Sequence, residues 1–204
     1  QMCIRDRDEK GRWIPEQKVQ DNLELAYAIS RFPDRDFRYR GVIISNSDLG
    51  YKGNTIPKAP AGTIHGGIEC INGQWYVFYH RCTNNTDFSR QACAEPITIL
   101  PDGSIPQVEI TTQGLNGKPI SAKGDIPAAY ACNLTTVKPI KLGLGKQQTL
   151  PRIDESEGEV YVADLMDNTQ LGYKYFNFVG LQKIGTTYRG TGAGVIEVRT
   201  QENG

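Results

Sequence analysis

Residues 63–81 (TIHGGIECINGQWYVFYHR) decide the fold. Apolar, β-branched and aromatic residues occupy both halves of this stretch, and Asn72-Gly73 separates them. Asn-Gly is the preferred pair of a two-residue type I′ turn, whose twist matches that of the flanking strands. The stretch therefore predicts an antiparallel hairpin with strands at 63–71 and 74–81.

Similar signals continue on both sides of this hairpin. Residues 89–100 are predicted to be a strand that turns at Pro101-Asp102-Gly103 and returns as 105–110. The other predicted strands are short runs: 41–45, 128–134, 138–142, 159–165, 172–179, 182–189 and 194–200. No stretch keeps the 3.6-residue period of an amphipathic helix. The sequence therefore predicts an all-β protein built of antiparallel hairpins.

The chain of 204 residues is long enough for one large domain or two small ones, at ~150 residues each. A run rich in Gly and Pro at 113–127 (QGLNGKPISAKGDIP) and a polar run at 147–158 both read as connectors. We predict one unit at residues 1–121 and a second at 122–204, with the boundary between 113 and 158. Residues 1–7 (QMCIRDR) fit neither a signal peptide nor a strand, and we interpret them as non-native.

Composition excludes several classes of protein. The 23 basic and 23 acidic residues balance, whereas a nucleic-acid binder needs a basic face. No run approaches the ~18 apolar residues of a membrane span. Five cysteines without a C-x-x-C pair give no zinc signature, and two histidines exclude a multi-histidine metal site. No Gly-rich phosphate loop follows a strand, so no organic cofactor is expected.

Two residues stand out as candidates for a site. His65 is followed by Gly66 and Gly67, which let the backbone approach a ligand closely. Arg90 begins a predicted strand, and its planar guanidinium suits paired hydroxyls or a carboxylate. The alternatives are a structural histidine bonded to a carbonyl and an arginine in a surface or interdomain ion pair. The residues by themselves leave both alternatives open.

Residues 22–112 resemble a known family in four stretches: 23–30 (LELAYAIS), 39–49 (YRGVIISNSDL), 63–81 and 88–108 (FSRQACAEPITILPDGSIPQV). These stretches are similar to the last blades of a family 43 glycoside hydrolase. The resemblance implies a five-bladed β-propeller with its site on the central axis. It also implies inverting cleavage of terminal arabinofuranosyl or xylosyl linkages in plant polysaccharides, by a secreted or periplasmic enzyme.

The resemblance also assigns roles to the two candidates. Arg90 matches the arginine that binds the sugar substrate, and His65 matches a histidine near the propeller axis, beside a bound metal ion or water. Calcium is the metal expected, either structural or in the central cavity.

The resemblance identifies no catalytic acid or base in this chain, because its spacing places the acid at or before residue 1. Four glutamates match no catalytic position and are interpreted as structural or solvated: Glu16, Glu24, Glu69 and Glu95. We therefore expect a fragment that is inactive alone.

Residues 163–198 show a second resemblance, carried mostly by 172–178 (GYKYFNF). They are similar to the middle of a family 6 carbohydrate-binding module, a calcium-containing β-sandwich that is incomplete here. The aromatic residues of this run alternate, so two face each way: Tyr173, Tyr175, Phe176 and Phe178. They form either core and interface contacts or a platform on which sugars stack.

A different class of function remains an alternative. The chain is also consistent with a non-catalytic carbohydrate-binding β protein that shares the scaffold. Two upstream Asp and one upstream Glu in the gene favour the enzyme, and their absence favours the binding protein. A lectin-like structural protein has no supporting motif.

Overall fold

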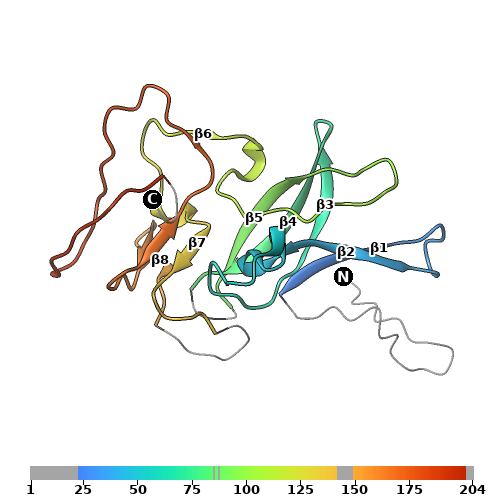
Figure 1. Cartoon of the computed structure of the whole chain (residues 1–204), viewed down its shortest axis with the longest axis horizontal. Coiled ribbons are helices and arrows are strands. Elements are labelled where there is room, and N and C mark those ends of the chain that lie inside the picture. Colours follow the sequence, from blue (N-terminus) through green and yellow to red (C-terminus); the bar gives the residue numbers. More distant parts are fainter. Residues whose placement is uncertain (1–22, 85, 87, 142–148, 201–204) are drawn as a thin grey trace.

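The computed structural model describes residues 23–84, 86, 88–141 and 149–200 (Figure 1). Its strands are β1 (Glu24–Ile29), β2 (Arg38–Ser45), β3 (Gly66–Ile71), β4 (Gln74–Cys82), β5 (Arg90–Ile97), β6 (Ile120–Ser121), β7 (Asn133–Thr135), β8 (Arg152–Ser156), β9 (Glu159–Ala163), β10 (Gln170–Gly172) and β11 (Phe176–Asn177). The helices of this part of the chain are single 3₁₀ turns: η2 (Asn46–Asp48), η3 (Tyr51–Gly53), η4 (Gly114–Asn116) and η5 (Ala128–Tyr130). None of them has the length or apolar character to cross a membrane. The predicted all-β class is confirmed.

The predicted hairpin forms the centre of a three-stranded antiparallel sheet with the order β3-β4-β5. Ile71 pairs with Gln74, so Asn72 and Gly73 alone make the turn. Their φ angles of 50° and 83° are the positive values that a type I′ turn requires. β5 pairs along the other edge of β4, with Arg90 opposite Cys82 and Ile97 opposite Trp75.

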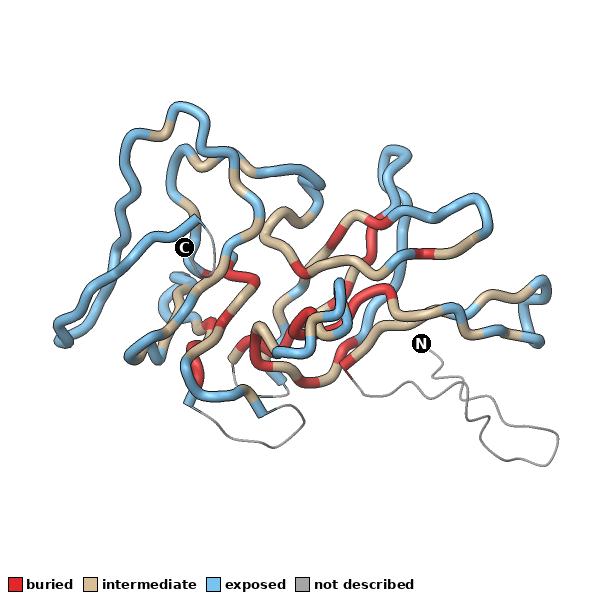
Figure 2. The backbone as a smooth tube through the Cα atoms, viewed as in Figure 1, coloured by how far each residue is buried: buried red, intermediate tan, exposed pale blue. Residues whose placement is uncertain are grey.

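One face of this sheet packs against the main hydrophobic core. Val77 and Tyr79 of β4 project into it, and β2 contributes Ile43 and Ile44. The remaining members are Ile64, Ile97, Ile105, Ile110 and Cys132. Figure 2 shows buried residues where β1–β2 meet β3–β5, and further buried residues in the later part of the chain. Since side chains alternate along a strand, the opposite face of β3–β5 lies outside this core.

The later part of the chain forms small strand pairs around a second core of alanines, Leu134 and Ile153. β7 pairs with β10, β8 with β9, and β6 lies parallel to β11. Arg81 of β4 joins this part to the sheet, because its buried guanidinium donates to the carbonyl oxygens of Ala131 (3.2 Å) and Cys132 (2.9 Å). The division at residues 113–158 stays a prediction.

A network of charges makes a second junction. Lys174 Nζ lies 3.0 Å from Asp48 Oδ2 and 2.9 Å from Glu109 Oε1, and all three side chains are mostly buried. Asp48 also accepts a hydrogen bond from the Ile110 N–H (2.6 Å), and Tyr175 donates its hydroxyl to Glu109 (2.6 Å). The two carboxylates therefore hold the segment before β11 against the first part of the chain.

Several predicted strands are absent from the described residues, and β1, β6 and β8 form where no strand was predicted. Residues 105–110 make no ladder, although the Val108 N–H bonds to the Ile43 carbonyl (2.8 Å), and Pro106 removes one donor. Residues 138–141, 182–189 and 194–200 also form no strand, and Leu142 lies outside the described residues. The run at 147–158 contains β8, which turns into β9 at Glu157-Gly158 with φ angles of 54° and 80°.

Candidate functional site

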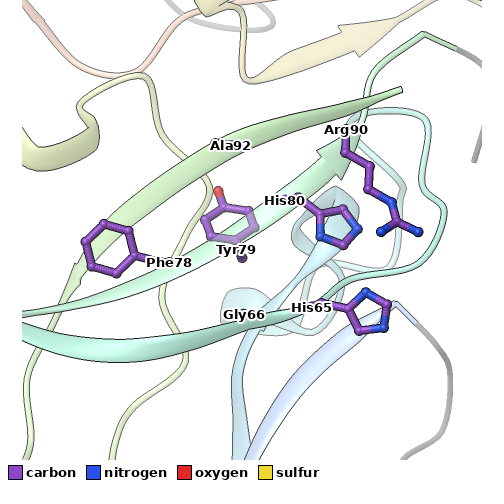
Figure 3. Close-up of a pocket in the computed structure, with 7 residues that line it drawn as sticks. All are labelled: His65, Gly66, Phe78, Tyr79, His80, Arg90 and Ala92. Carbon is purple, nitrogen blue, oxygen red and sulfur yellow. The ribbon is translucent and has the colours of Figure 1, made fainter. Parts of the chain in front are cut away.

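A shallow pocket of about 300 Å³ lies on the face of the sheet that points away from the core. It is lined by His65, Gly66, Phe78, Tyr79, His80, Arg90 and Ala92 (Figure 3). Along β4, the buried residues Val77, Tyr79 and Arg81 alternate with Phe78 and His80. Because successive side chains point to opposite faces of a strand, Phe78 and His80 lie on the pocket face. The pocket is thus built by the same strands that the hairpin pattern predicted.

Two imidazoles meet at one end of the pocket. His65 directly precedes β3, and its ring centroid lies 5.3 Å from that of His80 on β4, with the rings tilted by 43°. Burial, together with the neighbouring Arg90 and His65, lowers the pKa of His80 from its usual 6.5. His80 is therefore neutral near pH 7, and a neutral imidazole has one donor and one acceptor nitrogen. Within the described part of the chain, its buried Nε2 has no hydrogen-bond partner.

Arg90 completes this polar end. It is the first residue of β5, its side chain is exposed, and Figure 3 shows it on the same side as the two imidazoles. The sequence singled out His65 and Arg90 separately, and the structure brings them to one pocket. It also adds His80, which sequence reasoning missed. The register of the hairpin could have identified His80, because Gly66 pairs with Tyr79 and His80 therefore lies beside His65.

No acidic residue is among those that line the pocket, as far as the structure describes the chain. Glu95 lies on the opposite, buried face of β5, where it accepts hydrogen bonds from the Thr111 N–H and hydroxyl (2.6 Å each). Burial raises its pKa from 4.5 to about 7. Glu69 is exposed on β3, Glu24 is half-buried on β1, and Glu16 lies outside the described residues. None of these glutamates gains a catalytic assignment.

The residues around His65 do not fit a calcium site. Calcium takes about six to eight oxygen ligands. The neighbours of His65 are an imidazole and a guanidinium, and the described residues hold no group of three or more His, Cys, Asp or Glu suited to a metal. A calcium ion beside His65 would need oxygen ligands from elsewhere, so we derive no chemical step from it.

The aromatic residues of 172–178 lie at the junction described above. Phe176 packs with Tyr173 and Phe178, at centroid distances of 6.5 and 6.4 Å. The Tyr173 hydroxyl donates to the Ala128 carbonyl (3.0 Å), and the Tyr175 hydroxyl binds Glu109. Both tyrosines keep more than a third of their surface exposed. Contacts within the chain thus account for the hydroxyl groups, while both side chains stay partly exposed.

The fold and pocket together define an all-β protein with a small, partly apolar pocket and neutral and cationic hydrogen-bonding groups. A xylosidase/arabinosidase from Thermoclostridium stercorarium is 44% identical to this chain over 193 residues, which cover 89% of the chain. The chain spans 41% of the length of that relative. No protein-family model matches the chain. No solved structure matches it significantly.

Proposed function

We propose that this chain is part of a glycoside hydrolase that removes terminal xylosyl or arabinofuranosyl units from plant polysaccharides. The observation that carries the proposal is the 44% identity to a xylosidase/arabinosidase over most of the chain. The pocket agrees with it, since a guanidinium and imidazoles are suited to sugar hydroxyls. Because such a substrate is a polymer outside the cell, we propose a secreted or periplasmic protein.

We further propose that the first part of the chain supplies blades of a five-bladed propeller of family 43, and the second part an incomplete family 6 sandwich. Antiparallel meanders such as β3–β4–β5 are the units from which propellers are built. Inversion requires two carboxyl groups roughly 6.5–9.5 Å apart. We propose that the acid and base come from other parts of the protein, since no described pocket residue is acidic. The 204-residue chain alone should therefore be inactive.

In this proposal Arg90 holds the sugar and His65 orients water or hydroxyl groups beside it. The test is steady-state hydrolysis of aryl xyloside and aryl arabinofuranoside by the complete polypeptide that the gene encodes. Arg90→Ala should lower kcat/KM by roughly 30- to 1,000-fold, as expected for ~2–4 kcal/mol of charge-assisted hydrogen bonds. Arg90→Lys should be nearly as harmful because an ammonium lacks the planar fork. His65→Ala should cost less.

A thermal melt of each variant provides the control. If Arg90→Ala keeps wild-type kcat/KM, or loses activity only in step with unfolding, Arg90 is a structural residue. If the complete polypeptide hydrolyses neither substrate, the enzymatic proposal is wrong.

A non-catalytic carbohydrate-binding protein is the second candidate. It is favoured by the lack of an acidic side chain among the described pocket residues and by the partly exposed aromatic side chains near β11. Sugar binding without hydrolysis by the complete polypeptide would select this candidate.

A further inference from the structure

Phe78 forms the apolar wall of the pocket, at the end away from Arg90 (Figure 3). It pairs across the sheet with Gly67 on one side and with Ala94 on the other. A Cβ atom added at Gly67 would meet nothing within 4 Å, so nothing in the described structure occupies that position. The ring of Phe78 is thus open to a ligand from the side of β3.

Tyr76, the next aromatic residue on the same face of β4, is covered by the chain, so of these two rings only that of Phe78 is open. Tyr76 is 8% exposed, because the segment around η4 covers it and accepts its hydroxyl hydrogen bond at the Leu115 carbonyl (3.0 Å). The rings of Tyr76 and Phe78 lie 6.4 Å apart. The chain therefore covers Tyr76 and leaves Phe78 at the edge of the pocket.

The polar wall lies about 7 Å further along β4, two residues on at about 3.4 Å per residue. There His80 presents a neutral imidazole, and Arg90 and His65 stand beside it. The pocket thus combines one aromatic surface with a cluster of hydrogen-bonding groups at roughly the width of a single sugar ring. Apolar walls with a few convergent polar groups are typical of small-ligand sites.

We propose that Phe78 is a specificity-determining residue that stacks on a six-membered xylopyranosyl ring while Arg90 and the imidazoles bind its hydroxyl groups. This inference rests on the proposed function and narrows its substrate class. The hydroxyl groups of β-xylopyranose are all equatorial, so its two faces present only axial C–H groups to an aromatic ring. The puckered five-membered arabinofuranosyl ring offers no such flat face. Phe78 should therefore favour xylosyl over arabinofuranosyl units.

The test compares the two aryl glycosides in the complete polypeptide, using Phe78→Leu, Phe78→Ala and Phe78→Tyr. Loss of the ring should lower kcat/KM for the xyloside at least tenfold, or about 1.4 kcal/mol, and for the arabinofuranoside less than threefold. Phe78→Tyr keeps the ring and should stay within threefold of wild type on both substrates. Phe32→Ala is the matched control, since Phe32 is exposed in the loop between β1 and β2, outside the pocket, and its loss should change neither value. Equal losses on both substrates, or none, would overturn the inference.

A binding measurement keeps the inference testable where the activity fails or a variant does not fold. Saturation-transfer NMR with methyl β-xyloside and the wild-type 204-residue chain should show transfer from aromatic protons to the axial C–H protons. Phe78→Leu should abolish this transfer, with folding checked by the amide spectrum, and Phe78→Tyr should retain it. Transfer that depends on the ring supports the inference even if no hydrolysis occurs. No transfer in the wild-type chain, or transfer unchanged in Phe78→Leu, would refute it.

Discussion

The stability of the chain should depend on pH mainly through one buried carboxyl group, that of Glu95. Its side chain is 1% exposed, and burial raises its pKa from 4.5 to about 7. The hydrogen bonds from Thr111 and the Tyr79 hydroxyl (3.3 Å) lower the pKa but do not offset burial. Glu95 is therefore a neutral acid in the folded protein below about pH 7.

The direction of the effect follows from this raised pKa. Between pH 4.5 and about 7 the folded state binds more protons at Glu95 than the unfolded state. The resulting stabilisation is fully present below pH 4.5 and is lost as the pH rises through 7. At about 1.4 kcal/mol per pKa unit, it amounts to about 3 kcal/mol, of which about 2.5 kcal/mol disappears between pH 5 and pH 8.

Glu95→Gln tests this reasoning, because glutamine imitates the neutral acid at every pH. Its carbonyl oxygen accepts from the Thr111 N–H, and its amide donates to the Thr111 hydroxyl. Urea unfolding at pH 5, 6, 7 and 8 should show the wild-type free energy of unfolding falling by about 2.5 kcal/mol. The variant should lack this fall, and the rise that the lowered pKa of His80 causes at the acidic end of the range should remain.

Glu69→Gln is the matched control, since Glu69 is exposed on the neighbouring strand β3. This variant should keep the wild-type slope. If Glu95→Gln loses stability in parallel with the wild type as the pH rises, the buried acid does not govern the pH dependence and the reasoning is refuted.

Two further predictions concern packing and charge. Lys174→Met leaves two buried carboxylates without their cation and should cost about 3 kcal/mol or more in urea unfolding. Arg189→Met, which breaks an exposed ion pair, should cost less than about 1 kcal/mol; equal costs would show that the Lys174 network adds nothing. Gly66→Ala places a Cβ 1.9 Å from the Phe78 carbonyl oxygen and should cost about 1–3 kcal/mol. Gly67→Ala has open space and should melt within a few degrees of wild type; a larger loss there than at Gly66 would contradict the packing argument.

The parts of the fold that could be predicted are those set by local sequence. Asn72-Gly73 adopts positive φ at both positions because few other pairs do so at low cost, so the central hairpin follows from the turn alone. Residues 105–110 and 182–200 have suitable composition for strands, but a strand exists only where a partner offers its backbone groups. That partner is remote in sequence, and local pattern does not reveal it. β8 was not predicted because most of its residues are polar, and for the same reason its turn into β9 at Glu157-Gly158 was not recognised.

The candidate site divides in the same way. His65 could be singled out because two glycines follow it, and Arg90 because a guanidinium begins a predicted strand. His80 and Phe78 look like ordinary members of a strand, and only the pairing with β3 and β5 shows that they share a face with His65 and Arg90. Glu95 likewise looked like any strand carboxylate until the register placed it opposite Val77, in the core.

Side chains on β4 alternate between the core and the pocket, so substitutions on this strand should affect either stability or ligand binding. Val77 is fully buried in the core and does not line the pocket, so changes there act on the free energy of unfolding. Phe78 and His80 stand on the other face, where the pocket lies, so changes there act on what the pocket binds. Because neighbouring residues share a backbone but not a face, a kinetic loss at Phe78 without loss of stability cannot come from the core. That separation makes β4 the strand on which the proposed function is best tested.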